Sequence, residues 1–249
     1  MHQPEEPSNH PFDESYFKTG TYANVSFKTY SQYWWSNRFY AILAKKHGPQ
    51  RGRVLEVGCG MGHLLAHFIP KYEVYGVDIN SWALAEAKRM IPSANFVIAS
   101  AEDLNVFPNQ TFSIVISKHV VEHLPNPGAA VAEMSRLLIP GGLLLLSTPN
   151  LLSLMRNVKK EKWIGYRDRT HISLHPPDYW IGLLKDNNLK PRRIFSDGFW
   201  DAPYIRFLPT RLQKFLFGAP GGLQAIFGWS ILPLVLGESL IVIACKNHG

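Results

Sequence analysis

Short apolar runs recur along the chain and predict a buried parallel sheet. Strands of such a sheet are covered on both faces, so their sequences are apolar throughout and do not alternate. The runs cover residues 53–58, 72–77, 95–99, 112–117 and 142–148, with further candidates at 191–196 and 239–245. Helical patterns lie between them at 62–69, at 81–90 with Ser81 as N-cap, and at 127–138, closed by Pro140, Gly141 and Gly142. This alternation predicts a doubly wound (Rossmann-like) α/β fold, whose mostly parallel seven-stranded sheet ends in an antiparallel last strand.

The same pattern predicts a single domain without internal repeats or a linker. Residues 1–47 form an N-terminal segment, with a frayed tail over 1–15 and an aromatic stretch over 16–47 that ends in a helix. Residues 50–150 carry the sheet pattern, 151–200 follow the fifth strand, and 201–237 are a hydrophobic insertion before the last strand. We therefore expect one domain over 1–249, with additions at its start and near its end.

Composition narrows the class of protein. The chain has 249 residues, with 26 Lys and Arg against 19 Asp and Glu, a formal charge of +7. No run of basic residues exceeds two, so we expect no nucleic-acid partner. Cys59 and Cys245 are the only cysteines, and the polar, proline-rich start lacks the apolar core of a signal peptide. We expect a cytoplasmic protein without disulfides, with membrane association as the alternative location, and the sequence predicts no particular oligomeric state.

The turn after the first strand carries the clearest chemical signal. Glycines at 58, 60 and 62 let the backbone lie against a ligand, but a dinucleotide fingerprint needs its third glycine at 63, where this chain has His63. Glu56, just before the turn, would repel a pyrophosphate and attract an ammonium group. Asp78 ends the second strand and is placed to accept both hydroxyls of a ribose. The ligand implied has a ribose, an amine and no phosphates, which S-adenosylmethionine fits.

Five segments in order strengthen this interpretation: VLEVGCGMG, VYGVDIN, ASAEDL, FSIVISKHVVEHLPNP and LLIPGGLLLLSTPN. They resemble the successive motifs of class I S-adenosylmethionine-dependent methyltransferases, most of all the ubiquinone-biosynthesis and small-molecule branch. The resemblance covers about residues 50–150 and returns near both final strands. It implies that the glycine turn contacts the methionine part of the cofactor. The acid after the second strand would bind the ribose, and the residues after the third strand would surround the adenine. The cofactor residues would be Glu56, Gly58, Cys59, Gly60, Asp78, Ile79, Ser100, Ala101 and Glu102.

One departure from the family pattern concerns the adenine. The family commonly has an acid at the position of Ser100, so the adenine amino group would rely on Glu102 or on the Ser100 hydroxyl. Ser117 and Lys118, at the carboxyl end of the fourth strand, should border the cofactor as well.

The segment HVVEH at 119–123 has the H-x-x-E-H spacing of a zinc peptidase. Such ligands need a long helix, whereas Pro125 and Pro127 limit any helix here to about one turn, so we reject a peptidase. Some ubiquinone-pathway O-methyltransferases carry E-x-x-E-H at this place, which would suit magnesium, but His119 replaces the first glutamate. We expect no metal, with Glu122 and His123 bracing the loop by hydrogen bonds.

Two histidines are candidates for the base that deprotonates a methyl acceptor. His171 lies in a D-x-x-H segment, which resembles one found over the acceptor in natural-product and sugar methyltransferases, and Asp168 could orient it. His119 is the second candidate, at the mouth of the cofactor crevice. A purely structural role for His171 is about equally consistent with the sequence.

The insertion has no charged residue from 215 to 237, but its prolines and glycines argue against a membrane span. We expect either a lid over the acceptor or an interfacial patch, making peripheral membrane contact through 203–237, and favour the lid because the apolar surface would otherwise be exposed. Either role suggests a hydrophobic, lipid-linked or sugar-bearing small molecule, methylated on oxygen. The alternatives are an NAD-dependent oxidoreductase and a non-catalytic S-adenosylmethionine-binding protein.

Overall fold

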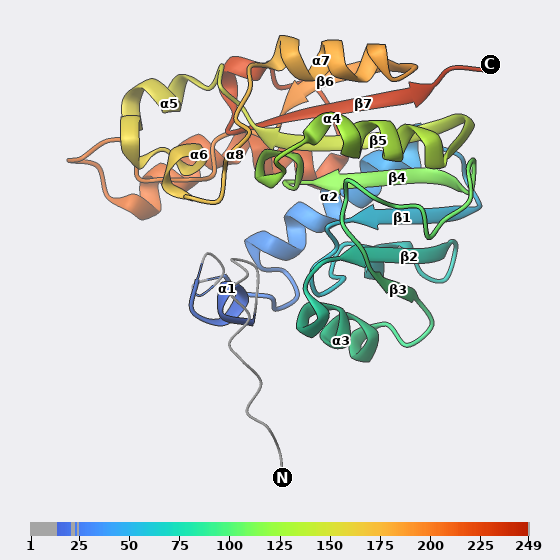
Figure 1. The fold of residues 1–249 in the computed structure, drawn as a ribbon. Helices are drawn as coiled ribbons and strands as arrows, with labels where there is room; N and C mark the ends of the chain where they lie inside the picture. Colours follow the sequence, from blue (N-terminus) through green and yellow to red (C-terminus); the bar gives the residue numbers. More distant parts are fainter. Residues whose placement is uncertain (1–13, 21–22, 24, 249) are drawn as a thin grey trace.

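The predicted strands form one sheet in the order β3-β2-β1-β4-β5-β7-β6 (Figure 1). The computed structural model describes residues 14–20, 23 and 25–248. Strands β1 to β5 are parallel, and β7 pairs antiparallel with both β5 and β6. This topology confirms the predicted fold class. The strands are β1 (Arg53–Val57), β2 (Glu73–Asp78), β3 (Asn95–Ile98), β4 (Phe112–Lys118), β5 (Leu138–Pro149), β6 (Leu189–Ser196) and β7 (Ser239–Lys246).

Helices cover both faces of the sheet. The α-helices are α1 (Glu14–Lys18), α2 (Gln32–His47), α3 (Ser81–Met90), α4 (Pro127–Leu137), α5 (Leu154–Lys159), α6 (Ile164–Arg167), α7 (Pro177–Asp186) and α8 (Thr210–Phe227). Single 3₁₀ turns are η1 (Leu65–Phe68), η2 (Val121–His123), η3 (Lys160–Lys162) and η4 (Leu234–Leu236). Helix α2 and turn η1 pack on one face, and α4 and α7 pack on the other.

Alternate residues of each strand enter two separate core layers. On β4, Ile114 and Ile116 pack with Leu43 of α2, whereas Val115 packs with Val131 of α4 and Trp180 of α7. Each layer is closed by a helix, and this burial on both faces explains why the central strands are apolar throughout. The two core layers therefore lie on opposite faces of the sheet.

The prediction of a helix over 62–69 is wrong. Only the single turn η1 forms, because Gly62 has a φ of 76° and the Ile69-Pro70 bond ends any helix before it. The cap of α3 is also different: Asn80, one residue earlier than Ser81, accepts a hydrogen bond from the Ala83 N–H at 2.9 Å. Both errors concern local turn geometry and leave the strand order unchanged.

Pro140, Gly141 and Gly142, which were expected to close the helix over 127–138, are part of strand β5. Helix α4 ends at Leu137 and β5 begins at the next residue. Gly141 has a φ of 74°, and the register between β4 and β5 shifts between Phe112 and Ile114. The proline and glycines therefore mark an irregularity at the start of β5 where the helix C-terminus was expected to unwind.

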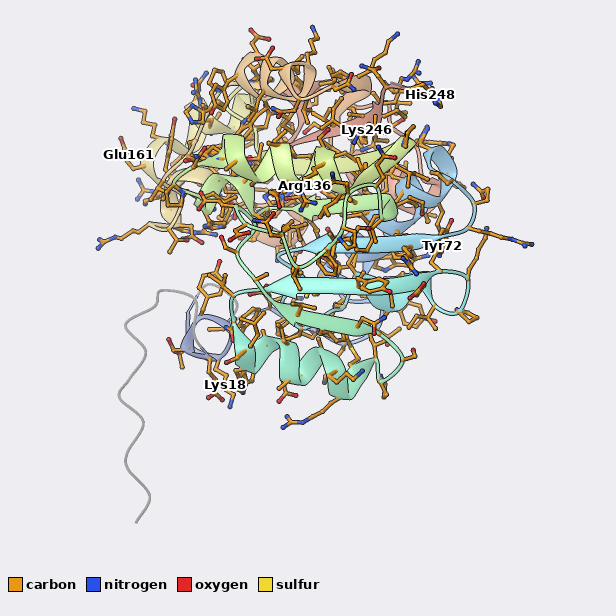
Figure 2. All side chains as sticks on the ribbon, turned by 45° about the vertical axis from the view of Figure 1, so that its right-hand side comes forward. Lys18, Tyr72, Arg136, Glu161, Lys246 and His248 are labelled. Atoms are coloured by element: carbon orange, nitrogen blue, oxygen red, sulfur yellow. The ribbon has the colours of Figure 1, made fainter. Side chains whose placement is uncertain are left out.

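Helices α5, α6 and α8 gather at one end of the molecule, and we call them the helical lobe (Figure 1). Helix α8 belongs to the insertion between β6 and β7, and α5 and α6 follow β5. Glu161 lies at this end, and His248, near the C-terminus, lies on the opposite side (Figure 2). Residues 1–13 of the expected frayed tail lie outside the described residues.

Candidate active site

The candidate site lies where the central strands β1 and β4 end. Both strands point toward the side of the molecule that carries α1 and the helical lobe (Figure 1). They are paired in parallel, with Val57 opposite Ser117, so the glycine turn after β1 and the HVVEH segment after β4 leave the sheet at one level. A Cβ on Gly58 would lie 2.3 Å from Cγ2 of Val120, which shows that the two segments touch.

Backbone hydrogen bonds hold the glycine turn against β2. The N–H groups of Gly58 and Cys59 donate to the Val77 carbonyl at 2.8 and 3.0 Å. The Gly60 N–H donates to Oδ2 of Asp78 at 2.8 Å, and the Asn80 N–H donates to its Oδ1 at 2.9 Å. Asp78 therefore braces the turn as well as facing the edge of the sheet, and burial raises its pKa.

Glu56 is a buried carboxylate below the glycine turn. Burial raises its pKa, and the positive charge of Lys118 acts in the opposite direction. Among the described residues, Oε2 of Glu56 has no hydrogen-bond partner. An acceptor atom that is buried, unpaired and next to a ligand-binding turn suits a donor group supplied by a ligand, such as an ammonium.

Lys118 is enclosed by α2. Its Nζ donates to Oδ1 of Asn37 at 2.5 Å and lies 5.2 Å and 4.9 Å from the ring centroids of Tyr33 and Tyr40. Burial lowers the pKa of Lys118, and the nearby carboxylates of Glu56 and Asp197 partly offset that effect. The positive charge of Lys118 thus favours the ionised form of Glu56, which burial disfavours.

The residues predicted to surround adenine form a tight turn after β3. The Glu102 N–H donates to Oγ of Ser100 at 3.2 Å, and Ala101 is buried between them. The Glu102 carboxylate accepts a hydrogen bond from the Asn126 N–H at 2.5 Å, which ties this turn to the start of α4. Ile79, after β2, exposes its apolar side chain. Ser117, in contrast, is completely buried and offers no surface to a ligand.

His119 belongs to a hydrogen-bond chain that joins three strands. Its Nδ1 lies 2.9 Å from Oε1 of Glu122, and its Nε2 lies 3.1 Å from Oγ of Ser239, at the start of β7. The Ser239 hydroxyl in turn donates to Oδ2 of Asp197 at 2.6 Å. Both ring nitrogens of His119 are therefore occupied, which leaves neither free to take a proton from an acceptor.

Asp197 and Ser239 are site residues that the sequence did not reveal. Asp197 also accepts hydrogen bonds from the Ser239 N–H at 2.9 Å and from Nε1 of Trp200 at 2.7 Å. Burial raises the pKa of Asp197, whereas these donors and the charge of His119 lower it. Ser239 reaches His119 because β5 lies between β4 and β7, and Asp197 reaches Ser239 because β6 pairs with β7. No local sequence motif indicates these pairings.

His171 keeps one ring nitrogen free of the described hydrogen bonds. Its Nδ1 lies 2.7 Å from the Gly165 carbonyl, and because a carbonyl only accepts, Nδ1 carries the hydrogen. The lone pair of the neutral ring is then on Nε2. The carbonyl of Gly165, rather than the predicted Asp168, makes the hydrogen bond described at this ring.

Asp168 instead acts on His123 through a threonine. The Thr170 hydroxyl donates to Oδ1 of Asp168 at 2.6 Å, and Nδ1 of His123 lies 2.9 Å from that hydroxyl oxygen. The ring centroids of His123 and His171 are 4.7 Å apart. The D-x-x-H segment and the HVVEH segment, which are far apart in the sequence, thus meet in one cluster.

Glu122 is the buried carboxylate at the centre of this cluster. Burial alone would raise its pKa, but the hydrogen bond from His119 and the charges of three histidines hold the pKa below its ordinary value. In the part of the chain that the structure describes, one potential ligand atom each of Glu122, His123 and His171 lie within 4.8 Å of one another, so these three side chains could hold a metal. The described bonds of Glu122 and His123 also brace the loop, as expected from the sequence.

Aromatic residues of the N-terminal segment cover the glycine turn. A Cβ on Gly60 would lie 3.4 Å from the ring of Phe17, and that ring lies 5.9 Å from Trp82 at the start of α3. Phe27 stacks on His63 with ring centroids 5.1 Å apart. The N-terminal aromatic residues therefore enclose the turn at which the cofactor is expected to bind.

Comparison with known proteins agrees with this arrangement. A family described as a methyltransferase domain matches residues 30–193. The chain is 32% identical to a trans-aconitate 2-methyltransferase of Methylobacterium nodulans, over 56% of this chain and 59% of that protein. It is 29% identical to a ubiquinone biosynthesis O-methyltransferase of Colwellia psychrerythraea, over 59% of this chain and 65% of that protein.

A solved structure shows the same fold. A SAM-dependent methyltransferase from Archaeoglobus fulgidus superposes with a TM-score of 0.58 at 19% identity, covering 84% of this chain and 94% of that one. The chain spans about three fifths of the length of the curated relatives it matches. The family match covers more than half of the present chain. The chain therefore belongs to the methyltransferase-domain family, whose cofactor is S-adenosylmethionine, and the resemblance seen in its motifs is confirmed.

Proposed function

We propose that this protein transfers the methyl group of S-adenosylmethionine to an oxygen of a hydrophobic small molecule. The observation that carries the proposal is the pairing of two features at one sheet edge. The first is a glycine turn with a buried, unpaired acceptor atom on Glu56 below it. The second is a histidine cluster directly beside that turn, in contact with it through Val120.

The residues at the ends of β1 and β2 suit the cofactor. The Glu56 carboxylate supplies an acceptor for the amine of the methionine part, and Asp78 keeps accepting capacity for the ribose hydroxyls because each carboxylate oxygen has two lone pairs. The exposed Ile79 offers apolar surface for the adenine ring. Cys59 and Gly60 would contribute by letting the backbone lie close to the cofactor, because their N–H groups already donate to the Val77 carbonyl and to Asp78.

The cofactor brings an electrophilic methyl group, and the protein contributes position and proton removal. When bound, the cofactor would supply the methyl carbon as electrophile and a thioether as leaving group for the oxygen of the acceptor. The acceptor's proton passes to Nε2 of His171, whose Nδ1–H is fixed by the Gly165 carbonyl. His119, with both nitrogens occupied, serves to position Glu122 and the loop.

The acceptor class rests on the surroundings of this site. The relatives named above act on chemically different molecules, a tricarboxylate and a ubiquinone precursor by their names, so they do not decide the acceptor here. Aromatic side chains from the N-terminal segment and the apolar helical lobe lie on the site's side of the sheet. A hydroxylated molecule with a large apolar part fits these surroundings.

Calorimetry with S-adenosylhomocysteine and with NAD tests the cofactor assignment. We expect saturable binding of S-adenosylhomocysteine and none of NAD, and the reverse result would favour an oxidoreductase. A screen of hydroxylated apolar metabolites with methyl-labelled cofactor then tests the reaction. Cofactor binding without label transfer to any acceptor in a broad screen would favour a non-catalytic binding protein.

A further inference from the structure

Helix α8 has the reverse of the burial pattern of an ordinary surface helix. Its two buried residues are both glutamines, Gln213 and Gln224, which lie three turns apart on its inner side. Its outer side exposes an apolar stripe at helical spacing, formed by Leu212, Phe215, Leu216, Leu223, Ile226 and Phe227. A helix on a water-facing surface normally has the opposite pattern, so the outer face of α8 is built to meet something apolar.

The buried glutamines anchor the helix by hydrogen bonds, in addition to the apolar packing of Phe217 on Tyr204 and of Ala225 on the core. Oε1 of Gln213 accepts hydrogen bonds from the N–H groups of Tyr204 and Ile205 at 2.6 and 2.8 Å, and its Nε2 donates to the Leu208 carbonyl at 2.6 Å. Gln224 binds the segment after the helix in the same way, through the N–H groups of residues 231 and 232 at 2.9 and 3.0 Å. Polar anchors on the inside leave the apolar side chains free on the outside.

The apolar surface extends beyond the helix. The segments before and after it expose Ile205, Phe207, Trp229, Ile231, Val235 and Leu236. Phe207 is 91% exposed and Phe215 is 71% exposed, values that are unusual for phenylalanine. The lid expected from the sequence rested on this surface being covered, and the structure leaves it open.

Charge limits the kind of partner. From residue 202 to 237 the only charged residues are Arg206, Arg211 and Lys214. All three are exposed, and no acidic residue lies among them. Basic side chains that border an apolar stripe on one helix are the pattern of helices that lie in the interface of an anionic membrane.

A small cavity lies beneath the stripe. It has a volume of about 170 Å³ and is lined by Gly198, Phe199, Leu216, Phe217, Pro220, Leu232 and Leu236. Its lining is apolar, and Leu216 and Leu236 also belong to the exposed surface. The cavity offers room for the end of a hydrocarbon chain next to the surface that would meet the lipid.

We infer that α8 and its flanking segments dock the protein on the surface of an anionic lipid bilayer. None of the helices in the described part of the chain is long and apolar enough to cross a bilayer. In this arrangement Phe207, Phe215 and their apolar neighbours enter the acyl boundary, and the basic side chains contact lipid phosphates. The helical lobe then holds the candidate active site close to the lipid, where apolar acceptors concentrate.

Co-sedimentation of the full chain with vesicles tests this inference without any methyl transfer. We expect binding to vesicles that mix phosphatidylglycerol with phosphatidylcholine, and weak binding to phosphatidylcholine alone. Replacing both Phe207→Ser and Phe215→Ser should weaken binding at least about tenfold, because two apolar side chains no longer leave water. The control Val106→Ser, 56% exposed on the connection between β3 and β4, should bind normally.

A series of charge variants distinguishes binding to anionic lipid headgroups from non-specific binding. The triple change Arg206→Ala, Arg211→Ala and Lys214→Ala should cost about fivefold in binding per charge removed. The same net charge change made at Arg51, Lys190 and Arg192, which are exposed on the sheet end and on β6, should have a much smaller effect.

Three outcomes would overturn the inference: no binding to either kind of vesicle, binding that the two phenylalanine changes leave intact, or a dimer in light scattering that those changes dissociate while vesicles bind nothing. Urea unfolding of each variant shows that loss of binding is not loss of the fold. Because the readout needs no cofactor, failure here leaves the proposed methyl transfer untouched.

Discussion

Asp78 is the residue on which the cofactor assignment depends most directly. Replacing it by alanine removes the acceptor for the Gly60 N–H at 2.8 Å and the expected partner of the ribose. We expect the affinity for S-adenosylhomocysteine to fall by about 1–3 kcal/mol, measured by calorimetry. The control Asp103→Ala changes an exposed acid after β3 and should bind normally. Unchanged affinity in the Asp78 variant would remove this residue from the ribose site.

His171 should affect turnover and leave cofactor binding alone. Replacing it by alanine removes the proposed base, whose Nε2 makes none of the described hydrogen bonds, so we expect turnover to fall about 10²- to 10⁴-fold. The affinity for S-adenosylhomocysteine should stay the same, because the ring packs beside His123 and Gly165 and not on the glycine turn proposed to bind the cofactor. His175→Ala, which removes a ring stacked on Tyr179 at 3.9 Å, is the matched control. Full activity of the His171 variant would assign the base elsewhere.

His67 makes the stability of the fold sensitive to acid. Burial, together with the charges of Lys45 and Arg38, lowers its pKa from 6.5 to about 4. Between these values the unfolded chain binds a proton that the folded protein does not, so the free energy of unfolding falls as the pH falls.

Because His67 is only half buried, we expect a contribution of about 1 kcal/mol between about pH 7 and pH 5. Urea unfolding at both pH values should show that His67→Gln loses about that much less stability on acidification. An equal loss in both proteins would show that the His67 pKa does not differ between the two states.

At the scale of elements, the glycine turn links the fold to the site. Gly58 has a φ of 72°, and a Cβ there would lie 2.3 Å from Val120. We expect Gly58→Ala to lower the free energy of unfolding by about 2–4 kcal/mol, from backbone strain and overpacking together, and to weaken cofactor binding.

Gly182 is the matched control, since it lies inside α7 with no atom within 4 Å of an added Cβ. There the change to alanine should stabilise the protein by about 0.5–1 kcal/mol, because alanine restricts the unfolded chain and favours the helix. Equal urea midpoints for the two variants would contradict the role of the turn.

The elements that the sequence predicted well are those defined by burial. Strands such as β4 carry apolar residues on both faces, and that pattern is local. Helix α8 was not predicted as a helix, because Gly218, Pro220 and Gly221 suggest a break within it. It is held by hydrogen bonds of Gln213 and Gln224 to the segments before and after it and by the packing of Phe217 on Tyr204, and such contacts cannot be recognised from spacing alone.

In the candidate site, too, some residues could be predicted from the sequence and others could not. The glycine turn, Asp78 and the histidines stand in local motifs and could be named from the sequence. Asp197 and Ser239 could not, because Ser239 meets His119 through the pairing of β5 with β4 and β7, and Asp197 meets Ser239 through the pairing of β6 with β7. The orientation of His171 by the Gly165 carbonyl also depends on how the chain turns after β5.

At the scale of the whole molecule, Glu238 joins the helical lobe to the sheet. Its buried carboxylate accepts hydrogen bonds from Nε1 of Trp163 at 2.6 Å, the Tyr204 hydroxyl at 2.8 Å and the Ser153 hydroxyl at 3.3 Å. We expect Glu238→Ala to lower the free energy of unfolding by about 2–4 kcal/mol, because buried donors lose their acceptor.

In the Glu238→Ala variant, the loss of stability should appear first in the helical lobe. Trypsin should cleave the Glu238 variant within 156–169 and 206–214 before it cleaves the sheet, since local opening exposes those basic residues. Glu161→Ala, which removes an exposed acid in the same lobe, should leave the cleavage pattern unchanged. Cleavage spread evenly along the chain would show that Glu238 supports the whole fold rather than this connection.

The insertion between β6 and β7 leaves and re-enters the sheet at nearly the same point. The Glu238 N–H donates to the Gly198 carbonyl at 3.0 Å, and a Cβ on Gly237 would lie 2.5 Å from the Gly198 nitrogen. A segment with adjoining ends can be lengthened, shortened or exchanged while both strands keep their partners. Residues 199–236 are thus a natural graft site: a short turn in their place would yield an enzyme core without its lipid-facing module, and the module could be transplanted onto a related core.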